Sequence, residues 1–316
     1  MMRKENRIMP EKEKSSLMYE RWFKEILHQL LIDLRDFPYA MIKGPILSLQ
    51  AYDDVCARNY HDIDFLIPKE MRKDFLLILK KNGFVADVRN KDGSFRELKR
   101  NEEIILMNSH QDIDYIKFCN DIYVDVDINY NLFWGEYRGK EIDLKSEFLS
   151  ETFLVEIFGQ EVKVLSKAKN FIQLCLHHYR EMNAIYFYKL SNPFIKSKFT
   201  DVYHLFKNMT ENDLIELKSL IKRYEIENYI YYVLYYTYQF YSDILLKLFI
   251  GKYETPEARA VINFFGLNDF ERKEWPFSLK ERAAIENLYE ALIPYLSKED
   301  IRKVENAVGF ITLTEQ

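Results

Sequence analysis

Residues 58–67 read RNYHDIDFLI, and this short stretch decides how the first half of the chain is interpreted. Asp62 and Asp64 lie one residue apart in a segment that otherwise has the apolar character of a buried strand ending at Pro68. Side chains at positions i and i+2 of a strand point to the same face. The two carboxylates therefore repel each other, and a buried strand that tolerates this repulsion predicts a functional site.

The segments around this motif alternate between strand-like and helix-like periodicity. Apolar residues recur at helical spacing from Leu17 to Phe37, and Pro68 and Gly83 bound a second helix in the usual order of proline first and glycine last. Short β-like runs separated by polar turns indicate a sheet. We expect further strands at residues 39–43, 84–88, 104–108, 114–118 and 122–130, and a hairpin over residues 153–165 that turns at Gly159–Gln160.

The second half of the chain has a predominantly helical pattern. Ser166 is placed to cap a helix that begins in KAKNFIQLCLHHYREM, and helical spacing continues to Ala307. The sequence therefore predicts a flexible N-terminus over residues 1–19, an α+β domain over residues 20–165 and an α-helical domain over residues 166–316.

Composition limits the class of protein. The 316 residues include 45 Lys and Arg against 50 Asp and Glu, a net charge of −5, so no broad basic surface argues for a nucleic-acid partner. The three cysteines are far apart and form no Cys-x-x-Cys pair. This pattern indicates reduced thiols in a cytoplasmic protein and argues against a zinc site.

One apolar stretch, residues 229–250, is long enough to cross a bilayer. It contains many tyrosines as well as Gln239, Asp243 and Lys247, so we expect a buried amphipathic helix in its place. The N-terminal segment MMRKENRIMPEKEKSS lacks the apolar core of a signal peptide. These features predict a cytoplasmic protein with no membrane partner.

A second acidic strand repeats the pattern of the first. The sequence YVDVDINY places Asp125 and Asp127 on one face of its strand. Two strands that present carboxylates toward a common side are unfavourable unless cations neutralise them, and hard oxygen ligands suit Mg²⁺ or Mn²⁺. The pattern predicts a two-metal site, in which one ion lowers the pKa of an attacking hydroxyl and the other holds a phosphate chain.

Cationic groups lie upstream of the aspartates. Lys43 and Gly44 fall where a strand turns into a helix, a place where backbone N–H groups and a lysine meet phosphates, and Arg58 precedes Asp62 by four residues. Taken singly, each feature also fits a turn, a helix cap or a surface ion pair. Their order and combination favour a site. The histidines show no zinc-ligand spacing, and we assign none of them a catalytic role.

The stretch MIKGPILSLQAYDDVCARNYHDIDFLI, residues 41–67, resembles the signature of the uncharacterised bacterial nucleotidyltransferases of the DNA polymerase β-like superfamily. The signature is a Lys-Gly pair, a helix, and an Arg followed after three residues by Asp-x-Asp and an apolar strand. The resemblance continues with KKNGF and with YVDVDINYNLF, and it extends over about residues 20–210. The matching positions are Lys43, Gly44, Tyr52, Arg58, Asp62, Ile63 and Asp64.

This resemblance implies a polymerase-β-like α+β fold, with a mixed sheet and flanking helices in a catalytic domain and an α-helical substrate-binding domain after it. It also implies metal-dependent transfer of a nucleoside monophosphate from a nucleoside triphosphate, expected to be ATP, to an acceptor hydroxyl with release of pyrophosphate. In such a site Asp62 and Asp64 bind both metal ions, Lys43 and Gly44 contact the triphosphate, and Arg58 neutralises it or braces the aspartate strand.

The resemblance places the third catalytic carboxylate on the second acidic strand. In the family this strand reads acid, apolar residue, His, aromatic, and the alignment puts the acid at Asp125. Asp127 then occupies the histidine position and Ile128 the aromatic one. Because these two positions depart from the pattern, Asp127 is a rival to Asp125 as the third metal ligand.

Two alternatives stay open. Toxin-type members of the superfamily modify tRNA ends or transfer a phosphoryl group, and RNKDGSFRELKR, residues 89–100, supplies a local basic edge for such a partner. The other alternative is a catalytically silent nucleotide-binding protein that keeps the fold. A small molecule, a peptide or a protein is favoured over tRNA as acceptor. The sequence does not identify the acceptor, the nucleobase or the oligomeric state.

Overall fold

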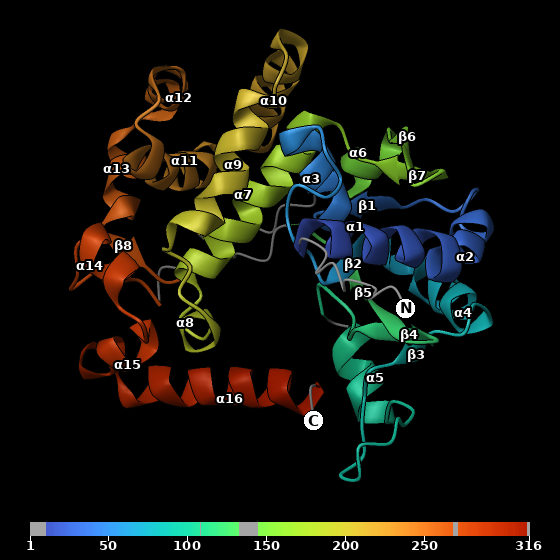
Figure 1. Cartoon of the computed structure of the whole chain (residues 1–316). Helices are drawn as coiled ribbons and strands as arrows, with labels where there is room; N and C mark the ends of the chain where they lie inside the picture. Colours follow the sequence, from blue (N-terminus) through green and yellow to red (C-terminus); the bar gives the residue numbers. More distant parts are fainter. Residues whose placement is uncertain (1–10, 108, 133–144, 268–270, 315–316) are drawn as a thin grey trace, which may run out of the picture.

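A seven-stranded mixed sheet organises the first half of the chain (Figure 1). The structure is a computed structural model that describes residues 11–107, 109–132, 145–267 and 271–314. The strand order is β3-β4-β5-β2-β1-β7-β6. The strands are β1 (Ala40–Ile42), β2 (Asp62–Leu66), β3 (Val85–Ala86), β4 (Tyr115–Cys119), β5 (Ile122–Asn129), β6 (Phe153–Ile157) and β7 (Gln160–Val164).

The two acidic strands are neighbours at the centre of this sheet. β2 and β5 run parallel, with Asp62 opposite Asp125 and Asp64 opposite Asp127. β1 pairs antiparallel with β2 and parallel with β7, and β4 pairs antiparallel with β5. The strands that hold the four aspartates therefore have a hydrogen-bonded partner on each side, which fixes their register.

One face of the sheet is covered by helices from the N-terminal part of the chain, which are drawn in blue and cyan in Figure 1. They bury the alternate residues of β2 and β5, including Ile63, Phe65 and Val126, in one apolar cluster. Tyr19 stacks on Tyr60 with 3.8 Å between the ring centroids, and this contact holds the loop that leads into β2. The covering elements are α1 (Glu11–Arg21), the π-helix η1 (Trp22–Leu27), α2 (His28–Asp33), the 3-10 helix η2 (Lys69–Met71) and α4 (Arg72–Lys81).

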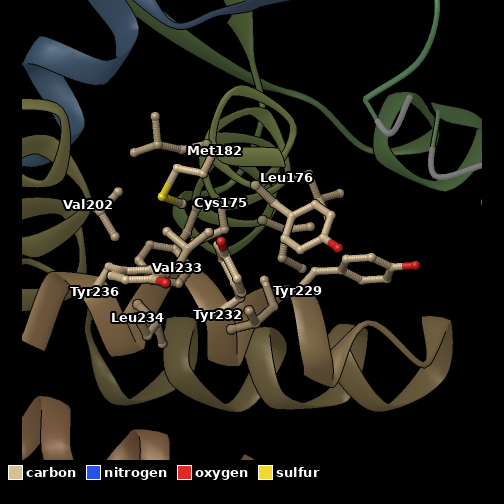
Figure 2. Packing of buried hydrophobic residues seen from close by; sticks show 14 of the residues in the cluster. Cys175, Leu176, Met182, Val202, Tyr229, Tyr232, Val233, Leu234 and Tyr236 are labelled. Atoms are coloured by element: carbon tan, nitrogen blue, oxygen red, sulfur yellow. The ribbon is translucent and has the colours of Figure 1, made fainter. Parts of the chain in front are cut away.

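Helices of the second half pack against the other, acidic side of the sheet. α7 (Lys167–Asn183) contributes to a second apolar cluster that also includes Ala40, Ile42 and Leu66 of the sheet. Figure 2 shows the centre of this cluster, where Cys175 and Met182 of α7 lie against tyrosines of α11 (Glu227–Tyr241). α3 (Gly44–Tyr52) and α9 (Lys196–Lys207) pack beside them.

The remaining elements are short helices and one two-stranded ribbon, formed by β8 (Phe264–Phe265) and β9 (Lys273–Glu274). The helices are α5 (Arg100–Met107), α6 (Lys145–Ser150), α8 (Phe187–Leu190), α10 (Glu211–Tyr224), α12 (Ile244–Ile250), η3 (Gly251–Tyr253), α13 (Pro256–Ile262), α14 (Leu279–Ala284), α15 (Leu288–Leu292), η4 (Ile293–Tyr295) and α16 (Lys298–Thr314).

The expected α+β class is confirmed, with four local corrections. The flexible N-terminus predicted over residues 1–19 is wrong for residues 11–19, which belong to α1 and include the buried Tyr19. The strand predicted at residues 104–108 is wrong, because residues 100–107 form α5. The first turn of α5 carries Glu102 and Glu103. Residue 108 lies outside the described residues. Acidic groups in the first turn favour a helix, and a short apolar run cannot by itself distinguish helix from strand. The hairpin turns one residue earlier than expected, at Phe158–Gly159, and the helical half contains the ribbon β8–β9.

The apolar stretch at residues 229–250 is divided into two helices, α11 and α12, which are separated by Ser242 in the left-handed conformation (φ +48°). Of the residues that the structure describes, none belong to a helix with both the length and the apolar character needed to cross a bilayer. Most of the α11 tyrosines are buried, so α11 is a core helix, as expected. The expectation of one buried helix through residue 250 is wrong, because α12 is a separate helix that exposes Ile244, Leu245 and Leu248.

The start of α7 is set by the predicted cap. The Ser166 hydroxyl accepts a hydrogen bond from the Lys169 amide and donates one to Glu216 of α10. We expect Ser166→Ala to lower the free energy of unfolding by about 1–2 kcal/mol, the usual cost of losing such a cap. Urea unfolding followed by circular dichroism measures the change. Ser197→Ala, on an exposed position of α9, is the control; equal stability of the two variants would contradict the capping role.

Candidate active site

Four carboxylates share one face of the central strands. Residues paired in register on parallel neighbouring strands have side chains on the same side, so Asp62, Asp64, Asp125 and Asp127 all point toward the side of the sheet on which α7 packs. Asp64 is almost fully buried, with 1% of its surface exposed, and the other three are half-buried. The sheet therefore brings together all the acids that the sequence suggested.

Lys43 neutralises part of this cluster. Its ammonium group lies 2.6 Å from Asp64 Oδ1, which also accepts a longer hydrogen bond of 3.4 Å from the Asn129 amide. Asp64 Oδ2 is buried and has no hydrogen-bond partner among the described residues. One oxygen of the most buried carboxylate is thus available to a cation, while the other is held by the lysine.

The crowding of acids changes their proton affinities. Burial raises the pKa of Asp64 to about 6, an effect that Lys43 opposes and Asp62 reinforces. Burial, followed by repulsion from Asp64, raises the pKa of Asp127 well above its ordinary value. Burial and nearby acids also raise the pKa of Asp125 to about 6. For Lys43, burial favours the neutral amine, but the facing aspartates outweigh it and raise its pKa, so the lysine stays charged.

Strained backbone positions the lysine. Lys43 has φ +51° and ψ −147°, a conformation that side-chain-bearing residues rarely adopt, and Gly44 follows with φ +38°. A Cβ atom on Gly44 would lie 3.2 Å from the Asp62 carbonyl oxygen, so this residue lets the turn approach β2 closely. α3 begins at Gly44, with Pro45 in its first turn.

Arg58 connects the site to the helical half. Its guanidinium forms an ion pair of 3.1 Å with Asp201 of α9, and it lies 3.4 Å from the Gly44 carbonyl oxygen. Tyr52 donates a hydrogen bond of 2.7 Å to the same Asp201 carboxylate. Arg58 therefore links the turn at Gly44 to α9, and the roles expected for it toward the triphosphate or the aspartate strand stay predictions.

A small polar cavity beside Lys43 contains residues that the sequence analysis did not select. Its volume is about 10 Å³, about the space that one water molecule needs. Gln173, His177 and Arg180 of α7 line it together with Asn129 and Lys43. Spacings of four and three residues place these α7 side chains on one helix face, a polar periodicity that was present in the sequence.

The two adjacent histidines of α7 both contact Glu181. His177 Nε2 lies 3.0 Å and His178 Nδ1 3.4 Å from this buried carboxylate. Burial lowers the pKa of His177 to about 3; Glu181 opposes this shift and Lys43 adds to it. The imidazole is therefore neutral at neutral pH.

The acidic face has the donor atoms that a hard cation prefers, but they are not arranged as a ready-made metal site. Within the described ranges no three His, Cys, Asp or Glu side chains are grouped in a way that could hold a metal ion. The Lys43 ammonium instead compensates Asp64. The unpaired Asp64 oxygen and the three neighbouring carboxylates fit Mg²⁺ or Mn²⁺ chemically, provided that the lysine releases Asp64.

Comparison with models of protein families identifies a family for most of the chain. The model of a family described as "uncharacterised nucleotidyltransferase" matches residues 11–242, well over half of the chain. The matched region contains the sheet, the turn at Lys43 and helices α7 to α11. No curated protein matches the chain.

The raised pKa of Asp125 leads to a prediction about stability. Because the carboxyl group binds its proton more tightly in the folded state, it destabilises the fold as the pH rises from about 4 through 6. In the presence of a chelator, Asp125→Asn should therefore be more stable than the wild type at pH 7.5, by on the order of 1 kcal/mol after solvent screening, and the difference should shrink at pH 5.

Urea unfolding at both pH values measures this difference. Asp36→Asn, at an exposed turn after α2, is the matched control and should gain no stability at either pH. An Asp125→Asn variant that is less stable than the wild type at pH 7.5 would show that the carboxylate is favourably held.

Proposed function

We propose, from the premise that the chain belongs to the family of uncharacterised nucleotidyltransferases, that it moves a nucleoside monophosphate from a nucleoside triphosphate to an acceptor hydroxyl. Family membership supports the general class of reaction. The observation that carries the finer proposal is the ion pair between Lys43 and the buried Asp64, on a face that holds three more carboxylates. Such a face suits a polyanionic substrate only when cations accompany it.

The triphosphate is bound at the turn between β1 and α3. Lys43 supplies a mobile positive charge, and the backbone N–H groups at the start of α3 are directed toward an anion at the helix N-terminus. Arg58 holds the Gly44 carbonyl and so fixes the turn, while its ion pair with Asp201 limits its own reach to the phosphates. ATP is the proposed donor.

Mg²⁺ or Mn²⁺ is the proposed cofactor, and Asp62 and Asp64 are the proposed ligands. Bound there, two divalent cations would acidify the acceptor hydroxyl and neutralise charge on the phosphates. The unpaired Asp64 oxygen supports this assignment, because a buried acceptor without a partner is costly. Lys43 exchanges its contact with Asp64 for one with the triphosphate, so the same ammonium compensates the acids in the empty protein and the phosphates in the complex.

Asp127 is the better candidate for the third carboxylate. Asp127 is paired in register with Asp64, whereas Asp125 is paired with Asp62. The charges of both Asp64 and Lys43 also act on Asp127. The family pattern of acid, apolar residue, His and aromatic also fits when it starts two residues later, at Asp127. In that alignment Asn129 takes the histidine position and Tyr130 supplies the aromatic residue.

In the proposed reaction the acceptor oxygen attacks the α-phosphorus. A new oxygen–phosphorus bond forms, the bond between the α-phosphorus and the bridging oxygen breaks, and pyrophosphate leaves. Asp127 takes the proton of the acceptor hydroxyl, a role that suits this carboxylate because burial raises its pKa and so makes it a stronger base. Asp125, toward the outer edge of the acidic face, assists by charge alone.

Transfer of label from α-³²P nucleoside triphosphates tests the proposal. With Mg²⁺ or Mn²⁺, the wild type should label one fraction of a cell extract that is separated into small molecules, protein and RNA. Asp64→Asn and Asp127→Asn should each reduce the rate by roughly a thousandfold or more, because several kcal/mol of transition-state stabilisation are lost. The reduction in rate caused by Asp125→Asn should be at least tenfold smaller than that caused by either of these variants. Asp36→Asn should retain wild-type activity.

The outcomes distinguish the alternatives. Full activity of Asp64→Asn would refute the assigned site, and a larger loss in Asp125→Asn than in Asp127→Asn would restore Asp125 as the third carboxylate. Label in the RNA fraction would identify a nucleic-acid acceptor, whereas label only from the γ-phosphate would identify phosphoryl transfer. No transfer, with metal-dependent nucleotide binding still present in calorimetry, would indicate the catalytically silent nucleotide-binding protein, and absence of both would refute the assigned nucleotide site.

A further inference from the structure

A buried arginine in the C-terminal part of the chain is surrounded by aromatic rings. Arg282 of α14 is 5% exposed, and its guanidinium carbon lies 4.4 Å from the ring centroid of Trp275, 4.7 Å from that of Phe194 and 5.2 Å from that of Tyr236. Among the described residues no carboxylate forms an ion pair with it. The rings stabilise the cation by their negative faces, but they leave its charge without a counter-ion.

Two N–H donors at this place lack an acceptor among the residues that the structure describes. Arg282 Nη1 donates a hydrogen bond of 3.0 Å to the Tyr236 hydroxyl. Arg282 Nε and the indole nitrogen of Trp275 are both buried and find no hydrogen-bond partner within the described part of the chain. Buried donors are normally paired, so two unpaired donors on side chains in direct contact indicate a group that is supplied from outside the chain.

Arg282 and Trp275 both line a cavity that is large enough for a small molecule. Its volume is about 360 Å³, within the range of about 300–1,000 Å³ that is usual for ligand sites. Tyr235, Tyr236, Trp275 and Phe277 form aromatic walls, and Arg282 lines the same space. Glu274 also lines it, but this acid is exposed. The cavity shares no residue with the one beside Lys43.

We propose that this aromatic cavity binds a small organic oxyanion with a flat apolar body. The carboxylate or phosphate of the ligand pairs with the Arg282 guanidinium and provides the missing counter-charge. Arg282 Nε and the Trp275 indole N–H are closed to solvent in the structure, and a small shift of the Trp275 ring brings them within reach of the same oxyanion. The flat body lies against the aromatic walls. The cavity contains none of the residues of the carboxylate face and is therefore a separate site, although Tyr235 and Tyr236 lie within the region matched by the family model.

A purely structural role for Arg282 makes a different prediction. If the guanidinium only supports the packing of Trp275, Phe194 and Tyr236, replacing it changes stability, but no small anion binds to the wild type. If the cavity is a binding site, the charge of the ligand controls its affinity. Pairs of ligands with the same shape and different charge therefore separate the two explanations.

Isothermal titration calorimetry with the full chain provides the test. The probes are benzoate, indole-3-acetate and phenyl phosphate, each compared with a neutral counterpart: benzamide, indole-3-acetamide and phenol. We expect saturable binding of at least one anion, at least tenfold tighter than that of its neutral partner. A carboxylate that binds more tightly than phenyl phosphate would identify the head group as a carboxylate, and the reverse as a phosphate.

Variants locate the binding. Arg282→Gln should weaken the best anion at least tenfold, and Trp275→Phe, which keeps a ring but loses the indole N–H, should weaken it severalfold. Arg259→Gln, at an exposed arginine paired with Glu254, should leave the affinity unchanged. If Arg282→Gln does not fold, as judged by circular dichroism, Trp275→Phe and Arg282→Lys decide. Equal affinity for charged and neutral probes, no saturable binding of any anion, or unchanged affinity in these variants would overturn the proposal.

Discussion

Repulsion among carboxylates is the constraint on which the acidic face of the sheet depends. The register of β2 and β5 places four aspartates side by side, and Asp64 is almost completely withdrawn from water. In such surroundings like charges repel strongly and a lone charge is poorly solvated. The Lys43 ammonium compensates part of this negative charge. The remaining repulsion, together with burial, raises the pKa values of Asp64, Asp125 and Asp127. A strand pair built only for stability would not need these residues, which is why the face is best explained by what it binds.

The position of Lys43 depends on several weaker contacts. Its unusual backbone conformation is stabilised because Gly44 allows the turn to approach β2 and because Arg58 holds the Gly44 carbonyl from the other side. Arg58 is itself fixed by Asp201, so α9 contributes to the geometry of a turn that is far away in the sequence. The helical half therefore contributes to the candidate site, and a change in the packing of α9 would shift the turn that positions Lys43.

The local parts of this site were predictable from the sequence. The Lys-Gly pair, the Asp-x-Asp strand and the capping Ser166 are short patterns with a local physical cause, and the structure brings Lys43 and Asp64 into contact. Their catalytic and metal-binding roles stay predictions. The choice between Asp125 and Asp127 depends on the register between strands, which no single segment encodes. The strand expected at residues 104–108 failed because a short apolar run fits either element, and the cavity beside Arg180 needed the packing of α7 on the sheet.

Both halves of the chain contain buried polar atoms without a hydrogen-bond partner among the described residues. Among the described residues, a buried carboxylate oxygen of Asp64 in the sheet finds no hydrogen-bond donor, and the buried Nε–H of Arg282 and indole N–H of Trp275 find no acceptor. Each omission costs free energy that other contacts must offset, since buried polar groups in folded proteins are almost always paired. The signs of the two are opposite, and so are the ligands they favour: a cation at the acids and an anion at the arginine. The sequence alone does not reveal these unpaired atoms, because most Asp and Arg side chains are either paired or exposed to water. Only the folded structure shows which of them are buried and lack a partner.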